Sequence, residues 1–103
     1  MNPLPIDFNG LDTTVHGPVR LGTLTALQVH GPLDFTTLKK QLSVPDGTLG
    51  QHLEKLVEIG YVGASTVLHG QRPHTTYRLT AKGRHAFADY LQCMRRLLDA
   101  TGR

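Results

Sequence analysis

Residues 33–79 place the strongest constraint on how this chain of 103 residues can fold. Two segments with apolar residues at helical spacing follow one another there, separated by only about three residues. Their inward positions are Phe35, Leu38, Leu42, Leu49, Leu53 and Leu56. Such spacing predicts two short helices joined by a tight turn.

Signals at the ends of these segments support the two helices. Asp34 or Thr36 can cap the first helix by accepting a hydrogen bond from a free backbone N–H. Pro45 suits the first position of the second helix, which we expect to run to Ile59. Gly60 then supplies the left-handed conformation that commonly ends a helix.

A β-hairpin is predicted directly after the second helix. Residues 61–68 contain β-favouring side chains, and residues 75–79 alternate in polarity along a second strand. Residues 69–74 form the predicted tip, which carries Arg72. Residues 33–35 are too short for an independent strand but can pair with the edge of this hairpin. The order is that of a helix-turn-helix followed by a wing.

The complete chain is predicted to be one domain, mainly α with a small β-hairpin and therefore α+β. Residues 1–9 are expected to be a flexible N-terminal arm, and residues 10–80 the winged helix-turn-helix domain with a three-helix core. Within it, Leu11–Val15 predicts a short leading helix and residues 18–30 a longer one. Residues 81–103 form a long C-terminal helix of the same domain.

Positive charge is concentrated in the second half of the chain. The whole sequence has 11 Lys and Arg against 8 Asp and Glu, a formal charge of +3. Between Gln71 and Arg96 there are six Lys or Arg and a single acid. This distribution favours binding to a polyanion.

The exposed face of the second central helix has side chains that suit the major groove of DNA. Gln51 can donate and accept together, which matches adenine, and His52 and Lys55 can donate to guanine or phosphate. Thr48 can touch a thymine methyl group or a phosphate, and Gly47 permits close approach to the backbone. The plainer interpretation is a solvated helix face, because any surface helix exposes polar residues.

The hairpin supplies the second set of candidate DNA contacts. Arg72 is suited to a narrow minor groove or to phosphate, and His74 lies beside it in the sequence. An ordinary charged turn would have similar residues. Lys39, Lys40 and Arg78 could contact phosphate without selecting sequence, and Thr36 is a further candidate for DNA contact.

Other kinds of site find little support. The six histidines contain no HxxxH or HxH pair, so no metal and no cofactor is expected. The sequence has no plausible catalytic triad, no paired carboxylates and no Gly-rich phosphate loop, which argues against an enzyme. Cys93 is the only cysteine, so an intramolecular disulfide is impossible, as suits a cytoplasmic protein. No apolar run is long enough to span a membrane.

Several runs along residues 10–98 resemble the short, single-domain winged helix-turn-helix regulators of bacteria and archaea, of the MarR and ArsR types. The most specific are PDGTLGQHLEKL and QRPHTTYRLTAKG. The resemblance implies a homodimeric transcriptional regulator, usually a repressor, whose partner is double-stranded DNA. It also implies that residues 45–59 read the DNA and that Arg72 is the arginine of the wing tip.

The C-terminal helix has apolar residues in steps of four, three and four, close to a heptad seam. In the family that it resembles, this helix and the leading segment form the dimer. The candidate interface residues are Leu11, Val15, Phe87, Leu91, Met94 and Leu98. The seam could instead cover the core of the monomer.

The chain departs from the family pattern in specific places. Val44 replaces a threonine that commonly precedes the reading helix, and the metal-binding pairs of ArsR-type sensors are missing. A small-molecule effector is therefore possible but has no named residues to support it. The main alternative function is a winged-helix module that binds another protein and not DNA.

Overall fold

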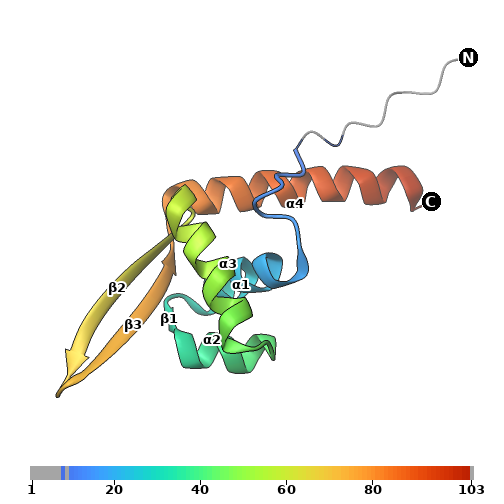
Figure 1. Ribbon diagram of the computed structural model, residues 1–103. Helices are drawn as coiled ribbons and strands as arrows, with labels where there is room; N and C mark the ends of the chain where they lie inside the picture. Colours follow the sequence, from blue (N-terminus) through green and yellow to red (C-terminus); the bar gives the residue numbers. More distant parts are fainter. Residues whose placement is uncertain (1–7, 9, 103) are drawn as a thin grey trace, which may run out of the picture.

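The computed structural model describes residue 8 and residues 10–102, so the arm predicted for residues 1–9 lies almost wholly outside the described residues. Within the described residues, four helices and three strands follow one another (Figure 1). They are α1 (Pro18–His30), β1 (Leu33–Asp34), α2 (Phe35–Leu42), α3 (Asp46–Ile59), β2 (Val62–His69), β3 (Arg72–Leu79) and α4 (Ala81–Thr101). The predicted α+β winged helix-turn-helix fold is confirmed.

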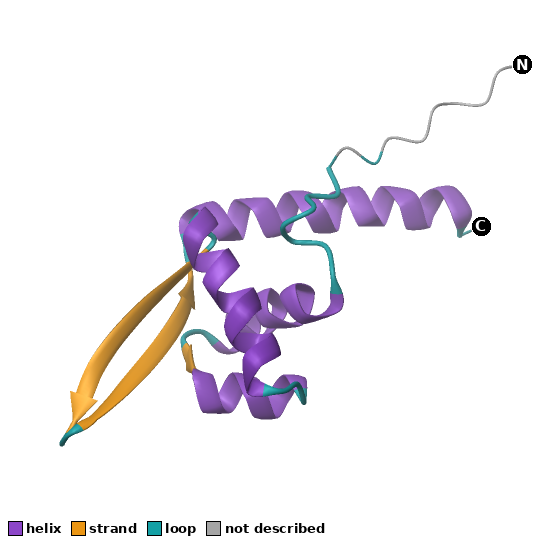
Figure 2. Ribbon diagram, viewed as in Figure 1, coloured by secondary structure: helices purple, strands orange, loops and turns teal. Residues whose placement is uncertain are grey.

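The three strands form one antiparallel sheet in the order β1-β3-β2. Strand β1 pairs Leu33 with Tyr77 and Asp34 with Thr76, as the short edge strand that the sequence suggested. Strands β2 and β3 form a long arm that projects from the helices (Figure 2).

The turn of the hairpin is shorter than the predicted tip, which ran from residue 69 to residue 74. The structure pairs His69 with Arg72, so only Gly70 and Gln71 lie between the strands. Gly70 has φ 66°, a left-handed conformation that suits the first central position of a two-residue hairpin turn. The predicted extent of the loop was therefore wrong, because Gly70 allows both strands to continue almost to the tip.

The core lies where α1, α2 and α3 meet under α4. The leucines at the centre are at most 2% exposed: Leu24, Leu27, Leu38, Leu49, Leu53 and Leu56. From α4, Phe87, Tyr90 and Cys93 close the core on one side. The C-terminal part of α4 extends beyond the helical body (Figure 1). The inward stripes predicted for the two central helices are the buried faces of α2 and α3.

The ends of the two central helices follow local sequence signals with one exception. Ser43, in the left-handed region with φ 54°, ends α2, and the turn to α3 takes three residues. Pro45 precedes α3 as its N-cap, whereas the sequence predicted it to be the first helical residue. Gly60 ends α3 with φ 93°, as expected. The side chain of Thr80 caps α4 by accepting a hydrogen bond from the N–H of Gly83 at 2.9 Å.

The short helix predicted at Leu11–Val15 is absent, and the segment forms turns. The carboxylate of Asp12 accepts a hydrogen bond from the N–H of Thr14 at 2.8 Å, which competes with a helix locally. Gly17, with φ 130°, then redirects the chain into α1. The segment is fixed to the end of α3 instead, because the hydroxyl of Tyr61 donates to Asp12 at 2.5 Å. This hydrogen bond and, to a smaller extent, burial raise the pKa of Tyr61 to about 12.

Asp34 caps α2 by accepting a hydrogen bond from the N–H of Thr37 at 2.8 Å. Hydrogen bonds from the side chain and backbone of Thr37, then one from His74, lower the pKa of Asp34 from 3.8 to about 2. A lowered pKa in the folded state stabilises the protein above pH 3.8. This stabilisation is lost as the pH falls through about 2.

We therefore expect Asp34→Ala to lower the free energy of unfolding at pH 7 by about 1 kcal/mol, the usual value of an N-cap. Asp34→Asn keeps a capping oxygen but cannot titrate. In thermal unfolding, the difference between the natural protein and the Asn variant should shrink between pH 4 and pH 2. A difference that stays constant over this range would contradict the assigned role of the charge.

Candidate nucleic-acid interface

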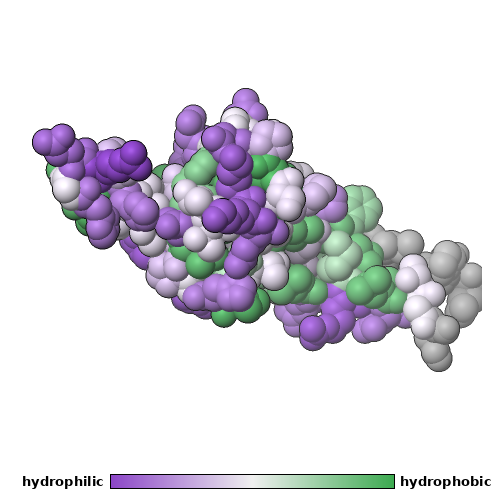
Figure 3. All heavy atoms as spheres, turned by 90° about the horizontal axis from the view of Figure 1, so that it is seen from below, coloured by the Kyte–Doolittle hydropathy of each residue, from purple (hydrophilic) through white to green (hydrophobic). Residues whose placement is uncertain are grey.

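The outward face of α3 holds the residues predicted to meet DNA. Gly47, Gln51 and Lys55 are exposed, whereas Thr48 and His52 are half-buried at the side of the helix. Hydrophilic side chains gather at the free end of the wing and near the centre of the face in Figure 3. All five predicted residues of α3 are thus accessible, and the helix begins next to the exposed turn.

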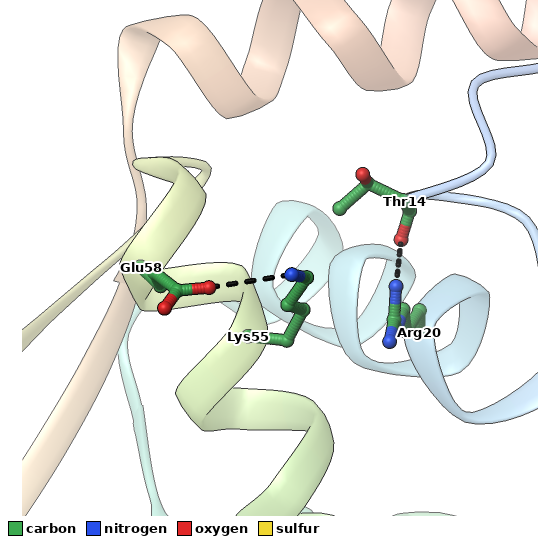
Figure 4. A network of polar contacts seen from close by, with 4 residues as sticks. All are labelled: Thr14, Arg20, Lys55 and Glu58. Carbon is green, nitrogen blue, oxygen red and sulfur yellow. Dashed lines mark hydrogen bonds and ion pairs between the residues drawn. The ribbon is translucent and has the colours of Figure 1, made fainter.

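Two acidic residues on α3 were missed in the sequence analysis. Glu54 and Glu58 are exposed and follow Gln51 at steps of three and four residues, so they share its face. The amine of Lys55 contacts the carboxylate of Glu58 at 3.3 Å (Figure 4). The helical periodicity alone could have revealed both acids. Because phosphates repel carboxylates, residues 47–53, which contain no acid, are the part of α3 best suited to DNA.

The two central helices are joined by an ion pair across the turn. The amine of Lys39 in α2 lies 2.7 Å from the carboxylate of Asp46, at the start of α3. Both side chains are largely exposed, so the pair adds little stability. The ion pair does hold Lys39, a predicted phosphate contact, beside the N-terminus of α3. Thr36 is exposed in the first turn of α2.

On the wing, the predicted basic residues share one face. Arg72, His74 and Arg78 lie at even-numbered positions of β3, and alternate residues of a strand point to the same side. Arg72 is exposed next to the turn. A Cβ atom on Gly63 would lie 2.6 Å from the guanidinium carbon of Arg78, so this group lies close over the β2 backbone.

His74 connects the wing to the helix-turn-helix, a contact that the sequence did not reveal. Its Nε2 atom lies 3.0 Å from the carboxylate of Asp34, the N-cap of α2. His74 also packs edge-on against His69 across the hairpin, with 5.1 Å between ring centroids. The wing and α2 are therefore joined through side chains as well as through β1.

A comparison of the whole chain with protein families identifies this arrangement. Residues 19–98 match the model of a winged helix DNA-binding domain. The chain belongs to this family. The predicted resemblance to winged helix-turn-helix proteins is thereby confirmed, and the chain carries a winged helix DNA-binding domain. Proteins of this fold and family are generally not enzymes.

Three similar proteins are informative. An uncharacterized protein of Methanocaldococcus jannaschii is 37% identical over 73 residues, which cover 71% of this chain and 79% of that protein. A transcriptional regulator homologue from Pyrococcus horikoshii is 25% identical with a TM-score of 0.82, covering 89% of this chain and 91% of that chain. The YusO protein of Bacillus subtilis is 16% identical with a TM-score of 0.79 and shows the fold alone. The alignment covers 90% of this chain but only 65% of YusO.

The predicted dimer residues of this winged helix protein differ in exposure. Val15 is fully buried and Phe87 is only 3% exposed, so both side chains belong to the core of the protomer and cannot meet a partner. Leu11 and Met94 are partly buried against that core. Leu91 and Leu98 are 40% and 60% exposed. Of the six predicted residues, Leu91 and Leu98 on α4 are therefore the most exposed.

Within residue 8 and residues 10–102, no group of three or more His, Cys, Asp or Glu side chains is placed to hold a metal ion. Among the same residues, no helix combines the length and apolar character needed to cross a membrane.

Proposed function

We propose that this winged helix protein is a homodimeric repressor that blocks transcription by occupying a palindromic operator. The observation that carries the proposal is the exposed, polar start of α3 beside a wing whose free end carries Arg72. In this proposal α3 enters the major groove and the tip of the wing reaches the neighbouring minor groove or backbone. Residues 10–80 bind DNA, and residues 81–103 form the dimer.

The side chains divide into those that read bases and those that hold the backbone. Gln51 is assigned to an adenine, and Lys55 and His52 to guanine or phosphate. Thr48 and Gly47 allow the start of α3 to approach the DNA closely. Phosphate contacts are assigned to Thr36, Lys39, Arg72, His74 and Arg78, which would fix the orientation without selecting a sequence.

Dimerisation is supported by the apolar residues that α4 leaves exposed. Leu91 and Leu98 are seven residues apart on one face of a helix of 21 residues, with Met94 between them. A two-fold axis at this surface would pair the same residues of both protomers. The two α3 helices would then meet half-sites about one helical turn (~34 Å) apart, which implies a palindrome.

The roles of Gln51 and Arg72 can be separated by substitution. Gln51→Ala should remove roughly 1–3 kcal/mol of discrimination at one base pair in each half-site. Arg72→Ala should weaken binding to all sequences and reduce the dependence of log affinity on log salt by about 0.9 for each lost phosphate contact. The measurement is a titration of operator and scrambled DNA at several salt concentrations.

An exposed residue away from the interface supplies a matched control. Gln28→Ala in α1 removes the same group as Gln51→Ala and should leave affinity for operator DNA unchanged. If Gln51→Ala weakened binding to operator and scrambled DNA equally, its assignment to a base would be wrong. Binding by the natural protein to neither DNA would favour the alternative, a module for protein partners.

A further inference from the structure

Arg20 of α1 contacts His52 of α3, although 32 residues separate them. The guanidinium Nε donates a hydrogen bond to the imidazole Nδ1 at 3.0 Å. Its Nη1 donates to the carbonyl oxygen of Thr14 at 3.1 Å (Figure 4). Two bonds in different directions hold the guanidinium, so Arg20 is fixed beside the side of α3.

This contact determines where the hydrogen of His52 lies. A guanidinium donates hydrogen bonds and cannot accept them, so the Nδ1 atom that it contacts must accept. A neutral imidazole carries its one hydrogen on the other nitrogen, Nε2. Arg20 therefore selects the tautomer of His52 that has a donor at Nε2 and also restrains the rotation of the ring.

The selected atom is available for a ligand. His52 is half-buried on the same helix as Gln51, and among the described residues no protein group forms a hydrogen bond with its Nε2. In the major groove, N7 and O6 of guanine, N7 of adenine and O4 of thymine accept hydrogen bonds, as phosphate oxygens do. A ring held with its N–H outward is complementary to such an acceptor and mismatched to the amino groups of adenine and cytosine.

We propose that Arg20 is a positioning residue for DNA recognition, which fixes His52 as a donor at Nε2 toward an acceptor on the DNA. This inference rests on the proposed function and adds the chemistry that α3 recognises at this position. It treats Arg20 as acting through His52 and not as a phosphate contact. A guanine edge and a phosphate oxygen offer the same chemistry, and base preference distinguishes them.

The first experiment measures the tautomer in the full-length protein without DNA. Two-bond ¹H–¹⁵N spectra above pH 8 should show His52 with its hydrogen on Nε2, assigned by comparison with His52→Ala. Arg20→Met, which keeps an unbranched chain but has no donor, should shift the Nδ1 resonance. An Nδ1–H tautomer in the natural protein, or an unchanged spectrum in a folded Arg20→Met variant, would overturn the proposal independently of any DNA.

The second experiment compares DNA preference by binding selection on randomised fragments. Arg20→Met and His52→Ala should each reduce the preference at the same base position by roughly fivefold, the size expected for one hydrogen bond. The double variant should lose no more than either single variant, because both remove one interaction. Gln28→Met, at an exposed polar residue of α1 with no assigned DNA or dimer contact, is the control and should leave the preference unchanged.

The remaining outcomes have definite meanings. If both variants weaken binding equally on all sequences while the double variant stays non-additive, the acceptor is a phosphate and the proposal stands. Additive losses would overturn it and make Arg20 an independent DNA contact. If the natural protein selects no sequence and does not bind DNA, the proposed function is wrong. The role of His52 as a donor to DNA is then wrong as well, whatever the spectra show.

Discussion

Replacing Leu91 and Leu98 together by aspartate is expected to convert the protein into a monomer and to lower its affinity for a full operator at least about 100-fold. Both side chains are exposed on α4, so the protomer has no need of them for its own core. Four added carboxylates in an apolar two-fold interface would remain uncompensated. Joining two DNA-binding units raises affinity by roughly 10²–10⁴, and this gain disappears in a monomer.

Light scattering measures the mass, and titration of a full operator against a single half-site measures the lost coupling. Val29→Asp is the matched control, because Val29 is an apolar residue with 69% exposure on α1. It should leave the dimer and the operator affinity unchanged. A folded Leu91→Asp, Leu98→Asp variant that is still dimeric would place the interface elsewhere.

Among the glycines of the described residues, replacement of Gly83 by alanine is expected to cause the largest loss of stability. A Cβ atom at Gly83 would lie only 2.0 Å from the carbonyl oxygen of Tyr61 and 2.8 Å from its carbonyl carbon. That carbonyl is backbone and also accepts a hydrogen bond from the N–H of Thr80 at 3.1 Å. The chain leaving α3 and the start of α4 would therefore have to separate.

Overpacking of this kind costs about 3 kcal/mol or more. For a domain of this size, the midpoint of thermal unfolding should fall by roughly 12–24 °C. Gly50→Ala is the control, because a Cβ atom at this helical position of α3 would have no neighbour within 4 Å. It should be neutral or stabilise the protein by about 0.5–1 kcal/mol. Equal melting temperatures for the two variants would contradict this account of the contact between α4 and Tyr61.

The features that the sequence predicted correctly depend on local patterns. The leucine stripes of α2 and α3 and the stop at Gly60 each involve neighbours within a few residues. The prediction of a helix at residues 11–15 was wrong for a local reason as well. The apolar spacing predicted a helix, but the side chain of Asp12 stabilises a turn.

Contacts between residues far apart in the sequence could not be predicted from these local patterns. A heptad-like spacing in α4 cannot distinguish Phe87, which closes the core, from Leu98, which remains exposed. The bond between Arg20 and His52 joins two helices and has no signature in either segment. Glu54 and Glu58 are a different case, since their position on the outward face of α3 follows directly from helical periodicity.

We expect this winged helix protein to recognise specific DNA sequences as a two-fold dimer. Its most direct test is to incubate the purified protein with genomic fragments at near-physiological salt and to sequence the fragments that remain bound. The expected result is an enriched palindrome whose half-sites lie about one helical turn apart. Retention that is lost with added salt and shows no common motif would contradict it and leave only a basic protein attracted to phosphate.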